Sequence, residues 1–262
     1  MLEKIAPLFV PNARNSRSTL AIMATIQVVV LLALWFASKS TLIPTPVEIA
    51  RALGRLFQEQ NLAYELWTST WLCVKSMLFA VVVSLVIAYA TVIPFFRPIG
   101  FLVSKGRFLT LVGLSFVFTQ LTSTGSGLKT SLLVFGITVF FVTSMVSIIR
   151  SVPKHEFYHA RTLRMSEWQV VWEVIILGRL DQVFEVIRQN FAISWTMLTL
   201  VEGISRSEGG IGPLLLNQQK YLHLDAVFAI QFLILCVGIL LDWAIGQMKV
   251  FFFPYSTLTT AQ

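Results

Sequence analysis

The sequence carries little charge. Asp, Glu, Lys and Arg make up only 13% of its 262 residues, about half of the share that is usual in soluble domains. Hydrophobic residues make up 56%, and the mean hydropathy is +0.76. This balance excludes an ordinary soluble domain and predicts an all-α, polytopic membrane protein.

Two other features are missing and a third is scarce. The sequence has no G-x-x-x-x-G-K-[ST] loop, which argues against a chain that hydrolyses ATP itself. It shows no internal repeat, which would have favoured an ion-coupled carrier. It has only two cysteines, Cys73 and Cys236, and both lie inside apolar runs. A disulfide framework or a cysteine metal site is therefore disfavoured, and we expect two inert buried thiols.

The net charge of +7 does not indicate a nucleic-acid partner. The basic residues lie in short loops between apolar runs, as the positive-inside rule predicts for a membrane protein. No cleavable signal peptide is evident, because the first apolar run is long enough to cross a bilayer and follows a basic segment. We therefore expect membrane lipid, and no nucleic acid, around this chain.

The apolar runs predict about six transmembrane helices. We expect a cytoplasmic segment at 1–18, a transmembrane domain at 19–262, and both termini in the cytoplasm. The segment Pro94 to Arg107 contains Arg97, Lys105 and Arg107 and is predicted to be cytoplasmic. The expected spans are Thr19–Ala37, Trp67–Val92, a short third one at Phe108–Thr122, Thr130–Ile149, Val183–Ile204 and Ala226–Met248.

Two features lie between or within the first spans. Val47 to Gln60 is predicted to form an amphipathic helix on the outer surface, with Arg51, Arg55 and Glu59 on its polar side. This helix is either a structural connector or a contact for a partner. Lys75 interrupts the second span and either extends to the interface or faces a polar interior.

The interval Ser151 to Ile176 is the longest charged stretch between two apolar runs. Pro153 suits a first helical turn. Phe157, Ala160 and Leu163 recur at a spacing of three, which predicts one apolar stripe along a short helix.

A second helix is expected to begin near Glu167. Ser166 and Gln169 form a capping-box pattern, and Met165 and Val170 have the spacing of a hydrophobic staple. The break between the two helices therefore falls at Arg164 to Ser166.

The same interval contains an H-E-x-x-H pattern at His155, Glu156 and His159. On a helix this pattern can bind zinc, with the glutamate as general base. A membrane metalloprotease is therefore an alternative function. Pro153 and Arg161 disfavour a zinc-binding helix, and two exposed loop histidines are the other interpretation.

Polar residues follow one face of the fifth predicted span. Asp181, Glu185 and Arg188 share this face, and their spacing allows Glu185 to pair with Arg188. The face points either into the bundle, toward a second copy or a water-filled path, or into the cytoplasm. Further along the chain, Gly210 and Gly212 permit a tight outer connection, and Asp225 is predicted to cap the last helix.

The stretch Ala160-Arg161-Thr162-Leu163, with Ser166 and the apolar helix after it, resembles the EAA loop of binding-protein-dependent ABC importer permeases. The nearest subgroup is the nitrate/sulfonate/taurine one, which Pro44-Thr45-Pro46, Gly210-Ile211-Gly212 and Gly238 to Asp242 also resemble. Three positions depart from the family pattern: Tyr158 replaces its usual Glu, His159 its Ala and Arg164 its Gly.

The resemblance implies a type I importer permease fold and no enzymatic activity of this chain. Its coupling helix, at about 153–165, would contact a cytoplasmic ATPase. The residues expected in that contact are Phe157, Tyr158, His159, Ala160, Arg161, Thr162, Leu163, Arg164 and Met165. Those expected along the translocation path are Arg188, Ser194, Trp195, Thr199 and Glu202.

The resemblance also implies the partners. Two ATPase subunits would bind ATP and Mg²⁺, so this chain would hold no cofactor. A second permease copy, identical or related, would complete the path, and a periplasmic or lipid-anchored binding protein would deliver the solute. The complex would work by alternating access in a bacterial inner membrane, and Lys75 and Arg188 favour an anionic solute.

Overall fold

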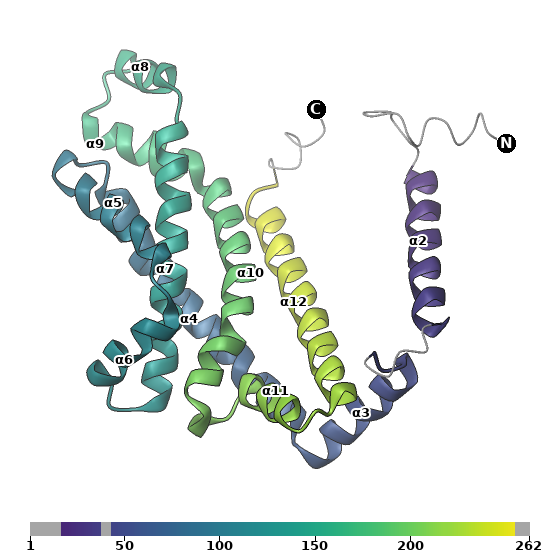
Figure 1. Cartoon of the computed structure of the whole chain (residues 1–262). Coiled ribbons are helices and arrows are strands. Elements are labelled where there is room, and N and C mark those ends of the chain that lie inside the picture. Colours follow the sequence, from purple (N-terminus) through teal and green to yellow (C-terminus); the bar gives the residue numbers. More distant parts are fainter. Residues whose placement is uncertain (1–16, 38–42, 255–262) are drawn as a thin grey trace.

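The computed structural model describes residues 17–37 and 43–254, and every regular element in these ranges is a helix (Figure 1). The predicted segment 1–18 therefore lies almost entirely outside the described residues. The long helices are α2 (Arg17–Ala37), α4 (Leu62–Ala90), α7 (Gly125–Ser151), α10 (Leu180–Ile204) and α12 (Leu224–Phe252). The shorter ones are α3 (Pro46–Glu59), α5 (Arg97–Lys105), α6 (Leu111–Leu121), α8 (Lys154–Thr162), α9 (Glu167–Val170) and α11 (Ile211–Lys220).

Four helices, α2, α4, α7 and α12, are long and apolar enough to cross a membrane. Their backbone groups bond within the helix, which is what an apolar surrounding requires. Helix α10 has 25 residues and runs the length of the bundle in Figure 1, but its charged residues leave it outside that set. The all-α, multi-span prediction is confirmed.

The third predicted span belongs to a bent pair of helical segments. The chain from Pro94 to Phe108 is bent by 114° against α6, so the pair is either a broken span or a re-entrant loop. Residues 97–105, from the segment predicted to be cytoplasmic, form α5, which packs along α7. The side of the membrane on which this segment lies stays a prediction.

Helix α7 lies at the centre of the core, with half of its most apolar stretch buried. It packs mainly against α4 and α10. The buried face of α4 consists largely of small side chains, which let helix backbones approach closely in a membrane protein. These residues include Ser69, Cys73, Ser76, Ala80, Ser84 and Ala88.

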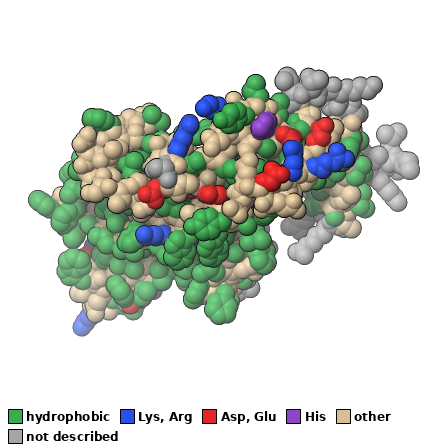
Figure 2. Space-filling view, turned by 90° about the horizontal axis from the view of Figure 1, so that it is seen from below, with side chains coloured by type: hydrophobic (Ala, Val, Ile, Leu, Met, Phe, Trp, Pro, Cys, Tyr) green, Lys and Arg blue, Asp and Glu red, His purple; other side chains and the backbone are tan. Residues whose placement is uncertain are grey.

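The first turns of the long helices lie at two opposite edges of the molecule. Helix α2 begins, and α12 ends, at the edge that carries α8, whereas α3 and α11 lie at the other edge (Figure 1). Figure 2 looks onto the edge with α3 and α11, where acidic and basic side chains gather above large apolar areas. Which edge faces the cytoplasm stays a prediction.

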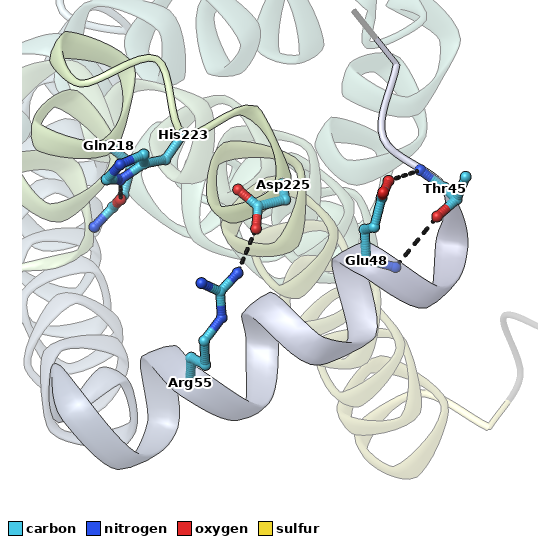
Figure 3. A network of polar contacts seen from close by, with 6 residues as sticks. All are labelled: Thr45, Glu48, Arg55, Gln218, His223 and Asp225. Carbon is cyan, nitrogen blue, oxygen red and sulfur yellow. Dashed lines mark hydrogen bonds and ion pairs between the residues drawn. The ribbon is translucent and has the colours of Figure 1, made fainter. Parts of the chain in front are cut away.

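The predicted surface helix is α3, and its start is set by a capping box. Thr45 accepts a hydrogen bond from the amide of Glu48, whose carboxylate accepts one from the amide of Thr45 (Figure 3). These bonds lower the pKa of the Glu48 carboxyl. Ile49 and Leu56 are buried on the opposite side, so the amphipathic pattern is confirmed.

Asp225 does not cap α12, contrary to the prediction. The N-cap residue of α12 is His223, and it makes no capping hydrogen bond with its side chain. Asp225 instead accepts a hydrogen bond of 2.5 Å from Arg55 of α3 (Figure 3). The partner was not foreseen because it lies far away in the sequence.

Two predictions about single residues meet different outcomes. Cys73 is buried as predicted, but Cys236 is exposed on α12, so only one thiol is buried. Lys75 is exposed on α4, which disfavours the interpretation that it faces a polar interior of this chain.

Candidate functional site

The segment after α7 forms the predicted helix, break and helix. Helix α8 ends in a left-handed residue, Arg164, at φ 56°. The amide of Arg164 donates to the carbonyl of Arg161 at 2.9 Å, and that of Met165 donates to the carbonyl of Ala160 at 3.4 Å. These two bonds form a Schellman motif, which usually has glycine at the left-handed position. The backbone therefore keeps the turn although arginine replaces glycine.

The capping box at Ser166 is confirmed. The hydroxyl of Ser166 accepts from the amide of Gln169 at 3.4 Å, and the side chain of Gln169 accepts from the amide of Ser166 at 2.8 Å. Val170 is buried and Met165 half-buried. After Val170 the chain continues as a π-helix (Val171–Ile176) and a short 3₁₀ turn (Leu177–Arg179) that lead directly into α10.

Two ion pairs hold this segment. Arg161 donates to both carboxylate oxygens of Glu167, at 2.9 and 3.2 Å, and so joins α8 to α9 across the break. The hydrogen bond from Arg161 lowers the pKa of the Glu167 carboxyl. Arg179 donates to Glu156 at 2.5 Å, which joins α8 to the start of α10. The second pair is the more sheltered.

The exposed side of α8 differs from the predicted stripe. Ala160 is buried and Phe157 half-buried, but Leu163 lies beyond the last helical residue and is 60% exposed. Tyr158 is also largely exposed, at 59%. We call the outward-facing set the α8 surface; it consists of Tyr158, His159, Arg161, Leu163 and Arg164. Thr162 is exposed as well, and its hydroxyl donates to the carbonyl of His159.

The H-E-x-x-H pattern finds no support as a metal site. Its glutamate, Glu156, is paired with Arg179, and both histidines are exposed. Within the described ranges no group of three His, Cys, Asp or Glu side chains could hold a metal ion. The metalloprotease alternative is therefore dropped.

The predicted path residues all lie on α10, but in different surroundings. Ser194 is fully buried and 3.3 Å from the sulfur of Cys73. Trp195 packs on α12, where its indole donates to the carbonyl of Ile234 at 3.0 Å. A Cβ added at Gly238 would lie 2.9 Å from that indole nitrogen, so glycine is needed for this contact. Thr199 is half-buried.

Glu202 is buried near the C-terminal end of α10. It accepts from the hydroxyl of Ser69 at 2.5 Å and from the amide of Gly212 at 2.8 Å. A Cβ added at Gly210, whose φ is 108°, would collide with this carboxylate. Glu202 therefore fastens the glycine-containing connection to α4 and α10, as the predicted tight turn requires.

The predicted pair between Glu185 and Arg188 does not form. Arg188 binds Asp242 of α12 through two hydrogen bonds of 2.8 and 2.7 Å. Glu185 accepts from Lys249 of α12 at 2.9 Å. These cross-helix pairs join α10 to α12 and replace a pair within one helix.

Sequence reasoning also missed Asp242 and Lys249 as the partners of Arg188 and Glu185. The available signal was their charge, because a charged residue inside an apolar run needs a partner or water.

Comparison with known proteins agrees with this arrangement. Residues 52–248 match the family described as "Binding-protein-dependent transport system inner membrane component". A solved structure described as "Crystal structure of an amino acid ABC transporter with histidines" has a TM-score of 0.61, covering 76% of this chain and 96% of that one. At 14% identity this likeness concerns the fold alone. No curated protein matches the chain. Since the match covers most of its length, the chain belongs to the family of inner membrane components of binding-protein-dependent transport systems.

Proposed function

We propose that the chain forms half of the translocation path of an ATP-driven importer and that α8 docks on a separate ATPase. The observation that carries this proposal is the α8 surface, which is exposed although it contains Tyr158 and Leu163. Exposed apolar and aromatic side chains on a rigid element favour a protein contact. The Schellman motif, the capping box and the Arg161–Glu167 pair make this element rigid.

The same segment offers a route for movement. The Glu156–Arg179 pair joins α8 to the start of α10, and α10 is joined to α12 by two further ion pairs. A displacement of α8 by an ATPase would thus act first on α10 and through it on α12. This is the connection that alternating access requires between ATP hydrolysis and the membrane helices.

The remaining partners follow from the family. A binding protein outside the membrane would deliver the solute to the edge with α3 and α11. A second copy of this chain, or a related permease, would complete the path, and the assembly would place both termini in the cytoplasm of a bacterium. The residues Arg188, Ser194, Trp195, Thr199 and Glu202 remain our proposal for helix α10 along that path.

The nitrate/sulfonate/taurine subgroup remains part of this proposal, and its members favour a small anion. Arg188 gives that prediction little weight, because Asp242 compensates its charge. Lys75 is exposed on α4, which disfavours a place in a polar interior of this chain.

The docking of α8 on an ATPase can be tested with the substitution Leu163→Asn. The measurement is the amount of ATPase that co-purifies with the tagged chain. We expect the ATPase to be lost, because the substitution places an amide in an apolar contact. Leu222→Asn is the matched control, since Leu222 is 78% exposed at the opposite edge. An ATPase retained equally by both variants would contradict the docking role. The mass of the wild-type complex separates a homodimer of permeases from a heterodimer.

A further inference from the structure

Arg107 lies at the middle depth of the helix bundle. It belongs to the 3₁₀ turn Gly106–Phe108, directly before the break that separates α5 from α6. A Cβ added at Gly106 would lie 3.0 Å from Cγ1 of Val139. Val139 is near the midpoint of α7. Arg107 is therefore far from either edge of the membrane-crossing part.

A cavity of about 340 Å³ opens at this break. Its wall is formed by the turn with Arg107, by the start of α6 and by parts of α7 and α10. Thr196 and Leu200 are among the α10 residues, and Arg107 is the only charged residue in this lining. We call this space the break cavity. It faces the helix that carries the predicted path residues.

Arg107 has no carboxylate partner among the described residues. The five ion pairs there involve other cations. The guanidinium lies 5.1 Å from the ring centre of Phe108, and the neighbouring Lys105 lies over Phe101 and Phe108 in the same way. An aromatic ring orients a cation but does not neutralise its charge. The side chain of Arg107 is also exposed.

An unpaired cation at this depth needs water or an anion. Facing lipid would be costly. Reaching the interface would require about 15 Å, half of the hydrocarbon thickness, which exceeds the length of an arginine side chain. The arrangement therefore indicates that Arg107 faces a water-filled space.

We propose that Arg107 binds an anionic group of the transported solute in the break cavity. This inference rests on the proposed permease function and adds the residue and the cavity at which the anionic group would bind. A guanidinium donates two parallel hydrogen bonds to the oxygens of a carboxylate, sulfonate or similar oxyanion. Arg107 and residues of α10 line the same cavity.

The test measures whether the break cavity prefers anions. Leu200→Cys supplies a thiol in the cavity wall, in the full chain with its partner subunits in membrane vesicles and with Cys73 and Cys236 replaced by alanine. The probes are two methanethiosulfonates of similar size, one carrying a sulfonate and one a trimethylammonium group. Labelling rates are divided by the rates with free cysteine. We expect about 10-fold faster labelling by the anionic reagent.

The preference should disappear in Arg107→Gln and remain in Arg107→Lys. Lys75→Gln, which removes an exposed cation from α4, is the matched control and should leave the preference unchanged. A preference that persists in Arg107→Gln would overturn the anion site. Equal labelling rates for the two reagents in the Leu200→Cys chain with intact Arg107 would overturn it as well. A thiol that neither reagent reaches would overturn the water-filled cavity. Co-purification of the ATPase from the same vesicles separates these outcomes from a failure of the permease function.

Discussion

The α10–α12 contact and the α5–α6 break both contain cations, but only those at the α10–α12 contact have carboxylate partners. Between α10 and α12, Arg188 and Lys249 are each matched by a carboxylate on the other helix. At the α5–α6 break, Lys105 and Arg107 lie over aromatic rings and have no carboxylate partner among the described residues.

The difference separates a structural role from a binding role. The α10–α12 pairs satisfy one another, and they hold two helices together without any ligand. The break leaves its charge unsatisfied, and only water or an anion from outside the chain can compensate it. The presence of a cation within a span is therefore less informative than the presence or absence of its partner.

The largest expected effect is a loss of stability when the Arg188–Asp242 pair between α10 and α12 is broken. Asp242→Asn leaves the charge of Arg188 without a carboxylate at the α10–α12 contact. We expect a loss of about 2 kcal/mol in the free energy of unfolding, less than for a fully buried pair because both side chains are partly exposed. The measurement is reversible unfolding in mixed SDS and maltoside micelles.

The control for this prediction is the double variant Arg188→Gln with Asp242→Asn. It removes both charges and should recover most of the lost stability, because no charge is left without a partner. A double variant as unstable as the single one would mean that the two side chains do not act as a pair.

The next largest effect is expected when Arg107, at the α5–α6 break, is given a carboxylate partner. Thr196→Asp places a carboxylate in the wall of the break cavity, which Arg107 also lines. The preference for the anionic reagent at Leu200→Cys should then fall about 10-fold, because the new charge offsets that of Arg107. Thr196→Asn, which has the same shape without the charge, should keep the preference. The same preference for the anionic reagent in Thr196→Asp and Thr196→Asn would contradict the role of charge in this cavity.

The sequence predicted helix ends well where the signal is local. Ser166 and Gln169 lie three residues apart, and their capping box needs nothing but the backbone between them. The long apolar runs likewise predicted the order of the main helices. About six spans were expected, whereas the described residues contain four candidate spans, or five if the bent pair counts as one. The predictions for α3, for the break at Arg164 and for α9 were confirmed for this reason.

Predictions failed where the partner lies far away in the sequence. Glu185 and Arg188 have the correct spacing to pair, but α12 offers each of them a better-placed partner. Asp225 could have capped its helix, and Arg55 binds it instead.

A smaller effect is expected for a cation outside the membrane part. Arg164 has no carboxylate partner among the described residues, and it is exposed, so its charge costs little. Its cost lies in the backbone, because φ is 56°. Arg164→Gly should raise the stability of the turn by about 1 kcal/mol. Hydrogen exchange of the α8 amides measures this, with Arg164→Ala as the control that removes the side chain but keeps the strain. Faster exchange in the glycine variant would contradict the strain.

The smallest effect concerns the exposed pair of Arg161 and Glu167. The hydrogen bond from Arg161 lowers the pKa of the Glu167 carboxyl. The contribution of Glu167 to stability is thus complete above the ordinary carboxyl pKa of about 4.3 and is lost as the pH falls through the lowered value. Solvent and salt screen such a pair, so the change should be small. Amide exchange in α8 and α9, corrected for its intrinsic pH dependence, should therefore speed up slightly toward low pH. Arg161→Gln should flatten this dependence, whereas Lys154→Gln should leave it unchanged. A dependence as steep in Arg161→Gln as in the wild type would show that another carboxylate governs the turn.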